Sequence, residues 1–146
     1  MDKADPIIGN WKLNLASSKF SPGLLKAKNE TVPKEATETY KLIGDQIELT
    51  VENTMTGGGR ISGRYTWPRN GGVAKAQEDV ASFKGVTIIE TLIAPGEWYA
   101  TFLKNDRQFM VVHKVVGIDG KTMSLNHTGT DDLGKPFEQI MVYDRQ

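Results

Sequence analysis

The sequence predicts an all-β protein, an antiparallel up-and-down β-barrel of about 8–10 strands. Runs rich in β-branched and aromatic residues recur along most of the 146 residues. Turn residues separate these runs about every 8–12 positions, which is typical of antiparallel barrels and sandwiches. Several runs also alternate apolar with polar residues, as strands do when one face covers a core. A series of hairpins with an apolar inner face favours closure into a barrel.

The individual strands are bounded by short turns. Hairpin-length loops are predicted at Gly44-Asp45, Thr56–Gly59, Ala94–Gly96 and Asn105-Asp106. The strands predicted between and around them are Ile8–Leu15, Thr37–Ile43, Gln46–Met55, Arg60–Trp67, Val86–Ile93, Glu97–Lys104, Arg107–Val116, Thr122–Thr128 and Phe137–Asp144.

Two segments interrupt this series of hairpins. Ala16–Glu35 contains two prolines and many polar residues, and predicts a long loop that lies as a lid over one end of the barrel. Val73–Phe83 carries apolar residues at helical spacing and predicts a short helix, with an irregular edge strand as the alternative.

Composition limits the function. The length fits a single domain over residues 1–146. The 18 basic side chains equal the 18 acidic ones, which argues against nucleic acid or an anionic membrane as a partner. Without cysteine, disulfides and thiol chemistry are excluded. No apolar run suits a membrane helix, and Met1–Pro6 lacks the apolar stretch of a signal peptide. We expect a cytoplasmic protein as written, or a periplasmic or secreted one if a leader has been removed.

The two histidines flank one turn. A three-residue Ile118–Gly120 loop would pair Gly117 with Lys121, and then His113 with Leu125 and Val111 with His127. Because side chains alternate along strands, both imidazoles would then face one apolar cavity. A two-residue Asp119-Gly120 loop would instead put them on opposite faces.

Glu90 is the predicted acidic neighbour of these histidines. A three-residue Ala94–Gly96 loop points Glu90 inward, which we favour, whereas a two-residue Pro95-Gly96 loop turns it outward. The same pairing arithmetic, applied to the other hairpins, predicts an aromatic and aliphatic cavity with few polar groups. Its ligand-binding residues are predicted to be Tyr40, Leu49, Val51, Asn53, Tyr65, Trp98, Phe102, Phe109, Val111 and Leu125.

Three interpretations of the histidines remain open. They are hydrogen-bonded core residues, or they perform acid–base catalysis together with Glu90, or they form a metal site with Glu90. No metal-spacing motif supports the last interpretation, so we expect neither a metal nor a cofactor. The predicted catalytic set is therefore His113, His127 and Glu90.

Several short motifs resemble those of small bacterial lipocalin-like proteins. They are Gly9-Asn10-Trp11, within the longer run Gly9–Phe20, then Asp119–Met123, and Gly129–Asp131 through Gly134–Phe137. The resemblance implies a calycin-type barrel with an internal ligand cavity, in which the tryptophan closes the narrow end. Arg145 is similar in position to the lipocalin arginine that packs over this tryptophan.

Two functions follow from these observations. The first is a cofactor-independent enzyme that acts on a small aromatic or apolar substrate by proton transfer, as a lyase, an isomerase or a hydrolytic enzyme. The alternative is a non-catalytic carrier of a small hydrophobic ligand. Neither requires nucleic acid or membrane insertion, and both leave a homo-oligomer open.

Overall fold

The computed structural model describes residues 4–20, 33–76, 85–130 and 134–146. These ranges contain eleven strands and no helix, so the all-β prediction is confirmed. Consequently, nothing in the four ranges forms a helix that could span a membrane. The strands are β1 (Gly9–Phe20), β2 (Pro33–Ile43), β3 (Gln46–Met55), β4 (Arg60–Pro68), β5 (Gly72–Val73), β6 (Lys75–Ala76), β7 (Val86–Ala94), β8 (Glu97–Lys104), β9 (Arg107–Val116), β10 (Thr122–Thr130) and β11 (Pro136–Arg145).

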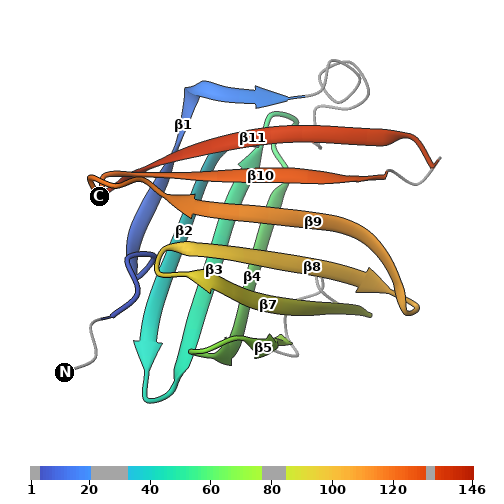
Figure 1. Ribbon diagram of the computed structural model, residues 1–146. Helices are drawn as coiled ribbons and strands as arrows, with labels where there is room; N and C mark the ends of the chain where they lie inside the picture. Colours follow the sequence, from blue (N-terminus) through green and yellow to red (C-terminus); the bar gives the residue numbers. More distant parts are fainter. Residues whose placement is uncertain (1–3, 21–32, 77–84, 131–133) are drawn as a thin grey trace.

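The strands form one antiparallel sheet that curls into a nearly closed barrel. Its order is β5-β7-β8-β9-β10-β11-β1-β2-β3-β4-β6, so neighbours along the chain are mostly neighbours in the sheet. In Figure 1, β7–β11 cross in front of β2–β4, and β1 joins the two groups. The remaining seam lies between β4 and β7. There β6 pairs with β4 and β5 pairs with β7, through two residue pairs each.

The first strand is longer than predicted and sharply bent (Figure 1). Its first part pairs with β2, and its register against β11 shifts between Asn14 and Lys19. Ser18 fills the shift, because its hydroxyl donates to the Asn14 carbonyl at 2.8 Å and accepts the Val142 N–H at 2.9 Å.

Both predicted interruptions of the barrel need correction. The ends of the predicted lid, residues 16–20 and 33–35, are parts of β1 and β2, because they pair with β11 and β3. The middle of the lid lies outside the described residues. The predicted helix is wrong for residues 73–76, where the chain bridges the seam as β5 and β6. Its remainder, residues 77–83, also falls outside the described ranges.

One end of the barrel is closed around Trp11. The Trp11 side chain is 1% exposed, and its indole N–H donates to the Ile7 carbonyl at 2.8 Å. The Arg145 guanidinium lies 4.2 Å from the centre of the ring and donates to the carbonyls of Ile8 and Pro6. Gly9, at a φ of 145°, leaves the space that this guanidinium occupies. The arrangement matches the one implied for Trp11 and Arg145 by the lipocalin resemblance.

Most predicted hairpin registers are confirmed. Leu42 pairs with Ile47 and Tyr40 with Leu49 across the Gly44-Asp45 turn. Glu90 pairs with Ala100, so its side chain points inward as favoured, and it is 1% exposed. The predicted three-residue Ala94–Gly96 loop was nevertheless wrong, because Ala94 pairs with Glu97 and the register shift at Ile93 restores the predicted pairing from Leu92 onward.

The register of β9 differs from the prediction and reverses that strand. Lys104 pairs with Arg107 as predicted, but Phe102 pairs with Met110, so Phe109 is left over as a β-bulge. Because side chains alternate between the two faces of a strand, one extra residue moves every later side chain of β9 to the opposite face. The inner face of β9 is therefore Met110, Val112 and Lys114. The prediction that Val111 and His113 point inward was wrong.

The loop after β9 contains a second one-residue difference. Gly117 donates its N–H to the Thr122 carbonyl at 2.8 Å, so the loop has four residues rather than three. Lys114 then pairs with Leu125 and Val112 with His127. The two shifts cancel for β10, so Leu125 and His127 keep their predicted inward positions. The two histidines lie on opposite faces of the sheet.

Candidate functional site

A cavity of about 240 Å³ occupies the barrel interior. Strands from all around the barrel contribute to its wall, and most of the side chains are apolar. The wall consists of Pro33, Glu38, Leu49, Val51, Asn53, Met55, Ile61, Tyr65, Phe102, Met110, Val112, Lys114, Leu125, His127, Gln139, Met141 and Tyr143. An apolar lining with a few polar groups is the usual character of a small-molecule site.

Three buried polar atoms of this wall lack a hydrogen-bond partner among the described residues. They are Asn53 Oδ1, Gln139 Oε1 and His127 Nδ1. His127 and Gln139 are direct partners across β10 and β11, so their side chains lie side by side on the inner face. Because buried polar atoms are nearly always hydrogen-bonded, unpartnered atoms in a cavity wall indicate where a bound molecule would be recognised.

A cluster of buried charged and phenolic groups lies partly in the cavity wall and partly in the core behind it. Glu38 accepts a hydrogen bond from Tyr40 at 2.5 Å and another from Tyr143. Glu90 Oε2 accepts hydrogen bonds from Lys114 Nζ and Tyr65 Oη, each at 3.3 Å. The Lys114 and Glu90 side chains are 2% and 0% exposed. We refer to these six residues, Glu38, Tyr40, Tyr65, Glu90, Lys114 and Tyr143, as the buried polar cluster.

Aromatic rings surround the Lys114 ammonium as well. Its Nζ atom lies 5.1 Å from the Tyr40 ring centre and 5.2 Å from that of Trp67. Such cation–π contacts attract an ammonium group electrostatically, and more strongly where water is excluded. Trp67 in turn packs edge-on against Trp98, with the ring centres 5.9 Å apart.

Burial dominates the titration of the cluster. It raises the pKa of Glu38 above its usual range, and the Lys114 charge and the hydrogen bonds from Tyr40 and Tyr143 only partly offset this. Burial likewise raises the pKa of Glu90, against the opposing charge of Lys114. Burial also raises the pKa of Tyr40, Tyr65 and Tyr143 well above the usual value, so all three phenols remain hydrogen-bond donors.

The two histidines have different environments. Burial lowers the pKa of His127 to about 4, with the backbone carbonyls of Leu125 and Gln139 acting in the opposite direction. The ring is therefore neutral near pH 7. His113 lies on the outer face, where Nε2 is 2.7 Å from Glu97 Oε2 and the ring stacks on Tyr99 with centres 4.3 Å apart. His113 cannot contact a molecule in the cavity.

The other predicted ligand-binding residues divide into three groups. Leu49, Val51, Asn53, Tyr65, Phe102 and Leu125 line the cavity. Tyr40 and Trp98 are fully buried in the core next to it. Phe109 packs edge-on against Phe102 from the bulge, with ring centres 6.2 Å apart, and Val111 points outward.

The three residues predicted to act together in catalysis or metal binding, His113, His127 and Glu90, do not share one face of the sheet. Glu90 and His127 face the interior, whereas His113 does not. Among the described residues, no group of three His, Cys, Asp or Glu side chains could hold a metal ion.

Sequence reasoning placed none of the charged or phenolic wall residues Glu38, Lys114 and Tyr143 in the predicted site, and it also left out Pro33, Met55, Ile61, Met110, Val112, Gln139 and Met141. For Glu38 a signal was present, because the predicted pairing with Val51 already placed it on the inner face. Lys114 was missed because the β9 bulge reverses its strand. A lysine within an apolar run is more often solvated than buried.

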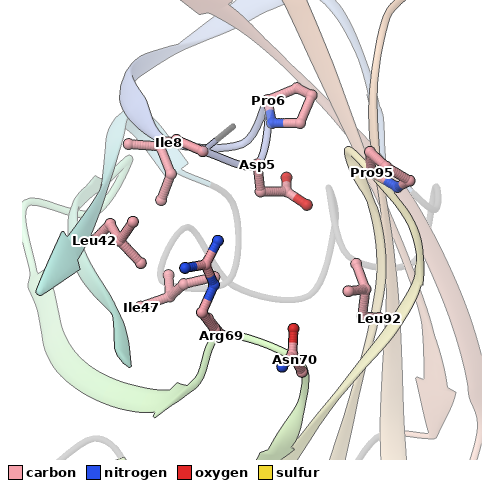
Figure 2. A pocket seen from close by; sticks show the side chains of 10 residues that line it. Asp5, Pro6, Ile8, Leu42, Ile47, Arg69, Asn70, Leu92 and Pro95 are labelled. Carbon is pink, nitrogen blue, oxygen red and sulfur yellow. The ribbon is translucent and has the colours of Figure 1, made fainter. Parts of the chain in front are cut away.

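A second cavity of about 330 Å³ lies at the end of the barrel near the N-terminal segment. Figure 2 shows Asp5 and Arg69 facing it among apolar side chains such as Ile8, Leu42 and Leu92. The Asp5 carboxylate already accepts hydrogen bonds from Ile7, Gly96 and Trp98. This cavity is larger, but it contains none of the unpartnered buried atoms, so the interior cavity is the better candidate for recognition.

Comparison with known proteins addresses the fold. No protein-family model and no curated protein matches the chain. Among solved structures it is similar to zebrafish ileal bile acid-binding protein complexed with cholic acid, at 10% identity and a TM-score of 0.56 over 97% of this chain and 99% of that one. A de novo designed fluorescence-activating β-barrel matches at 12% identity and a TM-score of 0.46, over 100% of this chain and 99% of the design. The siderocalin Ex-FABP matches at 12% identity and a TM-score of 0.42, over 97% of this chain and 74% of that one.

These identities bear on the fold alone, and only the first TM-score is high enough to carry an argument. That match covers nearly the whole of both chains. The chain has the fold of the lipocalin-like, calycin-type β-barrels.

Proposed function

We propose that this protein is a carrier that holds one small, mainly apolar molecule inside the barrel. The observation that carries the proposal is the interior cavity, with its apolar wall and its unpartnered polar atoms. Apolar surface drives such binding, and a few polar groups fix the orientation of the ligand. The match to a bile acid-binding protein supports this choice through the fold that the two chains share.

The volume of the cavity limits the size of the ligand. A protein cavity of about 150 Å³ accommodates benzene. By proportion, the 240 Å³ found here suits a molecule of roughly ten non-hydrogen atoms. Naphthalene-sized aromatic compounds are therefore suitable test ligands, whereas a four-ring steroid would require the barrel to expand.

Two neighbouring residues of β9 provide a matched test of where the ligand binds. Val112 lines the cavity, and Val111 points to the outer face. We expect Val112→Phe to fill part of the cavity and weaken naphthalene binding about tenfold or more, measured by isothermal titration calorimetry. Val111→Phe adds the same side chain outside and should leave the affinity unchanged. Equal affinities in the two variants, or no binding to the wild-type protein, would refute the proposal.

Catalysis by proton transfer is the second candidate. One observation favours it, since burial raises the pKa of Glu38 and Glu90 beside the cavity, and acid–base catalysis at neutral pH needs such groups. His127 and Glu90 keep their predicted acid–base roles in this alternative. Incubation with naphthalene-sized aromatic compounds, followed by mass spectrometry, distinguishes the two functions. A carrier returns every bound compound unchanged, whereas an enzyme yields a product that Glu90→Gln or His127→Gln would reduce about 10²–10⁴-fold.

A further inference from the structure

We infer that the cavity selects molecules that carry a hydrogen-bond donor and no negative charge, such as neutral aromatic alcohols, amides or amines, over carboxylates. This inference rests on the proposed carrier function and specifies its ligand class. It follows from two independent properties of the wall, the kind of polar atom left without a partner and the balance of buried charge.

The unpartnered atoms of the wall are mainly acceptors. Asn53 Oδ1 and Gln139 Oε1 are amide oxygens, which only accept hydrogen bonds. The Gln139 Nε2 atom donates to the Met141 sulfur at 3.8 Å, whereas its Oε1 atom has no partner among the described residues. Next to it, the neutral His127 ring offers Nδ1. A ligand hydroxyl or N–H group would satisfy an amide oxygen, whereas a carboxylate would add further acceptors.

The donor residues of the buried polar cluster already have hydrogen-bond partners. Tyr40 and Tyr143 donate to Glu38, and Tyr65 donates to Glu90. Lys114 donates to Glu90. A ligand anion would therefore compete with Glu38 and Glu90 for these four donor residues.

The buried charges also disfavour an anion. Glu38 and Glu90 are the two acidic members of the buried polar cluster, and Lys114 is its one cationic member. With both carboxylates ionised the cluster carries one net negative charge, and with one of them protonated it is neutral. Neither state attracts an anion, and charges interact strongly in an interior that excludes water. A neutral or cationic ligand meets no such repulsion.

Pairs of ligands of equal size test the inference on the wild-type protein. 2-Naphthol and 2-fluoronaphthalene differ by a donor, and 2-naphthamide and 2-naphthoate differ by a negative charge and a donor. By calorimetry at pH 7, we expect 2-naphthol to bind about tenfold more tightly than 2-fluoronaphthalene, the usual effect of one hydrogen bond to a buried acceptor. We expect 2-naphthamide to bind about tenfold or more tightly than 2-naphthoate.

Variants then assign the preference to particular residues. Asn53→Leu combined with Gln139→Met removes both amide oxygens at nearly constant volume and should abolish the preference for 2-naphthol. Asn126→Leu is the matched control, because Asn126 also has an unpartnered buried oxygen but does not line the cavity. Glu38→Gln removes one buried acidic group and should reduce the difference in affinity between 2-naphthamide and 2-naphthoate.

The outcomes separate this inference from the proposed function. Equal affinities within the ligand pairs, or tighter binding of 2-naphthoate, would overturn the inference and leave the carrier proposal standing. Failure of all four compounds to bind would overturn both. The wild-type measurements decide the matter even if a variant fails to fold.

Discussion

Replacing Lys114 with methionine removes the only cation of the buried polar cluster. Lys114 and Glu90 are in contact at 3.3 Å and almost fully buried, so the variant leaves Glu38 and Glu90 without a compensating charge. Breaking a buried ion pair from one side typically destabilises a protein by about 3–5 kcal/mol. For a chain of this length, such a loss lowers the melting temperature by roughly 10–15 °C.

The loss should depend on pH. Burial raises the pKa of both carboxyl groups above 4.5 in the folded protein. The folded chain therefore binds more protons than the unfolded chain above that pH, and stability falls as the pH rises towards the folded pKa values. The Lys114 charge holds both pKa values down. Without it they rise further, so Lys114→Met should be more damaging at pH 8 than at pH 5.

Urea unfolding followed by tryptophan fluorescence at pH 5 and pH 8 measures this difference. The double variant Lys114→Met/Glu90→Gln is the control, since it removes one of the two uncompensated carboxylates and should recover part of the stability at pH 8. If the single variant lost the same free energy of unfolding at both pH values, the buried carboxylates would not be the cause. A loss below about 1 kcal/mol would show that the pair behaves like an exposed one.

Four further outcomes follow from the structure. Burial lowers the pKa of His127 to about 4, so between pH 6.5 and pH 4 the ring is protonated in the unfolded chain but mostly neutral in the folded one. The free energy of unfolding should therefore fall as the pH decreases from 6.5 towards 4. His127→Phe should remove that dependence in thermal melts, and NMR titration of the wild-type ring should give the low pKa directly. Gly129→Ala should lower the melting temperature by several degrees, since a Cβ would collide with the Phe109 carbonyl oxygen. Gly9→Ala should displace Arg145 from Trp11 and change the near-ultraviolet circular dichroism spectrum of the indole. His113→Ala should lower the free energy of unfolding in urea by at most about 1 kcal/mol, because its contact with Glu97 is partly exposed.

Turn chemistry explains how much of the barrel could be predicted. The two-residue loop Asn105-Asp106 has both residues in the left-handed region, with φ of 53° and 61°, as tight hairpins require. Gly44-Asp45 also gave a register that the structure confirms. For Ala94–Gly96 the predicted loop is one residue too long, and the bulge at Ile93 compensates for the difference. The inward positions of Tyr40 and Leu49 followed from such a short turn. Leu125 kept its predicted position because two one-residue differences cancel.

The β9 bulge could not be predicted from turns, because it lies inside a strand. One local feature does accompany it. Gly129 pairs with Met110 next to the bulge, and only a glycine fits there against the Phe109 backbone. A glycine within a strand often marks a bulge or a close backbone approach. The buried polar cluster depends on this tertiary detail, because the bulge turns Lys114 towards Glu90 and His113 away.

The seam of the barrel gives the Tyr65–Glu90 hydrogen bond an additional role. Tyr65 belongs to β4 and pairs with Ala76 on one side of the seam, whereas Glu90 belongs to β7 and pairs with Gly72 on the other. Only two residue pairs join β6 to β4, and two join β5 to β7, so few backbone contacts hold these short strands in place at the seam. The side-chain contact, 3.3 Å long, joins the two margins from within. Local opening of the barrel should therefore begin at the seam between β4 and β7. Amide hydrogen exchange at Val73 and Ala76 would measure how far the Tyr65–Glu90 contact opposes that opening.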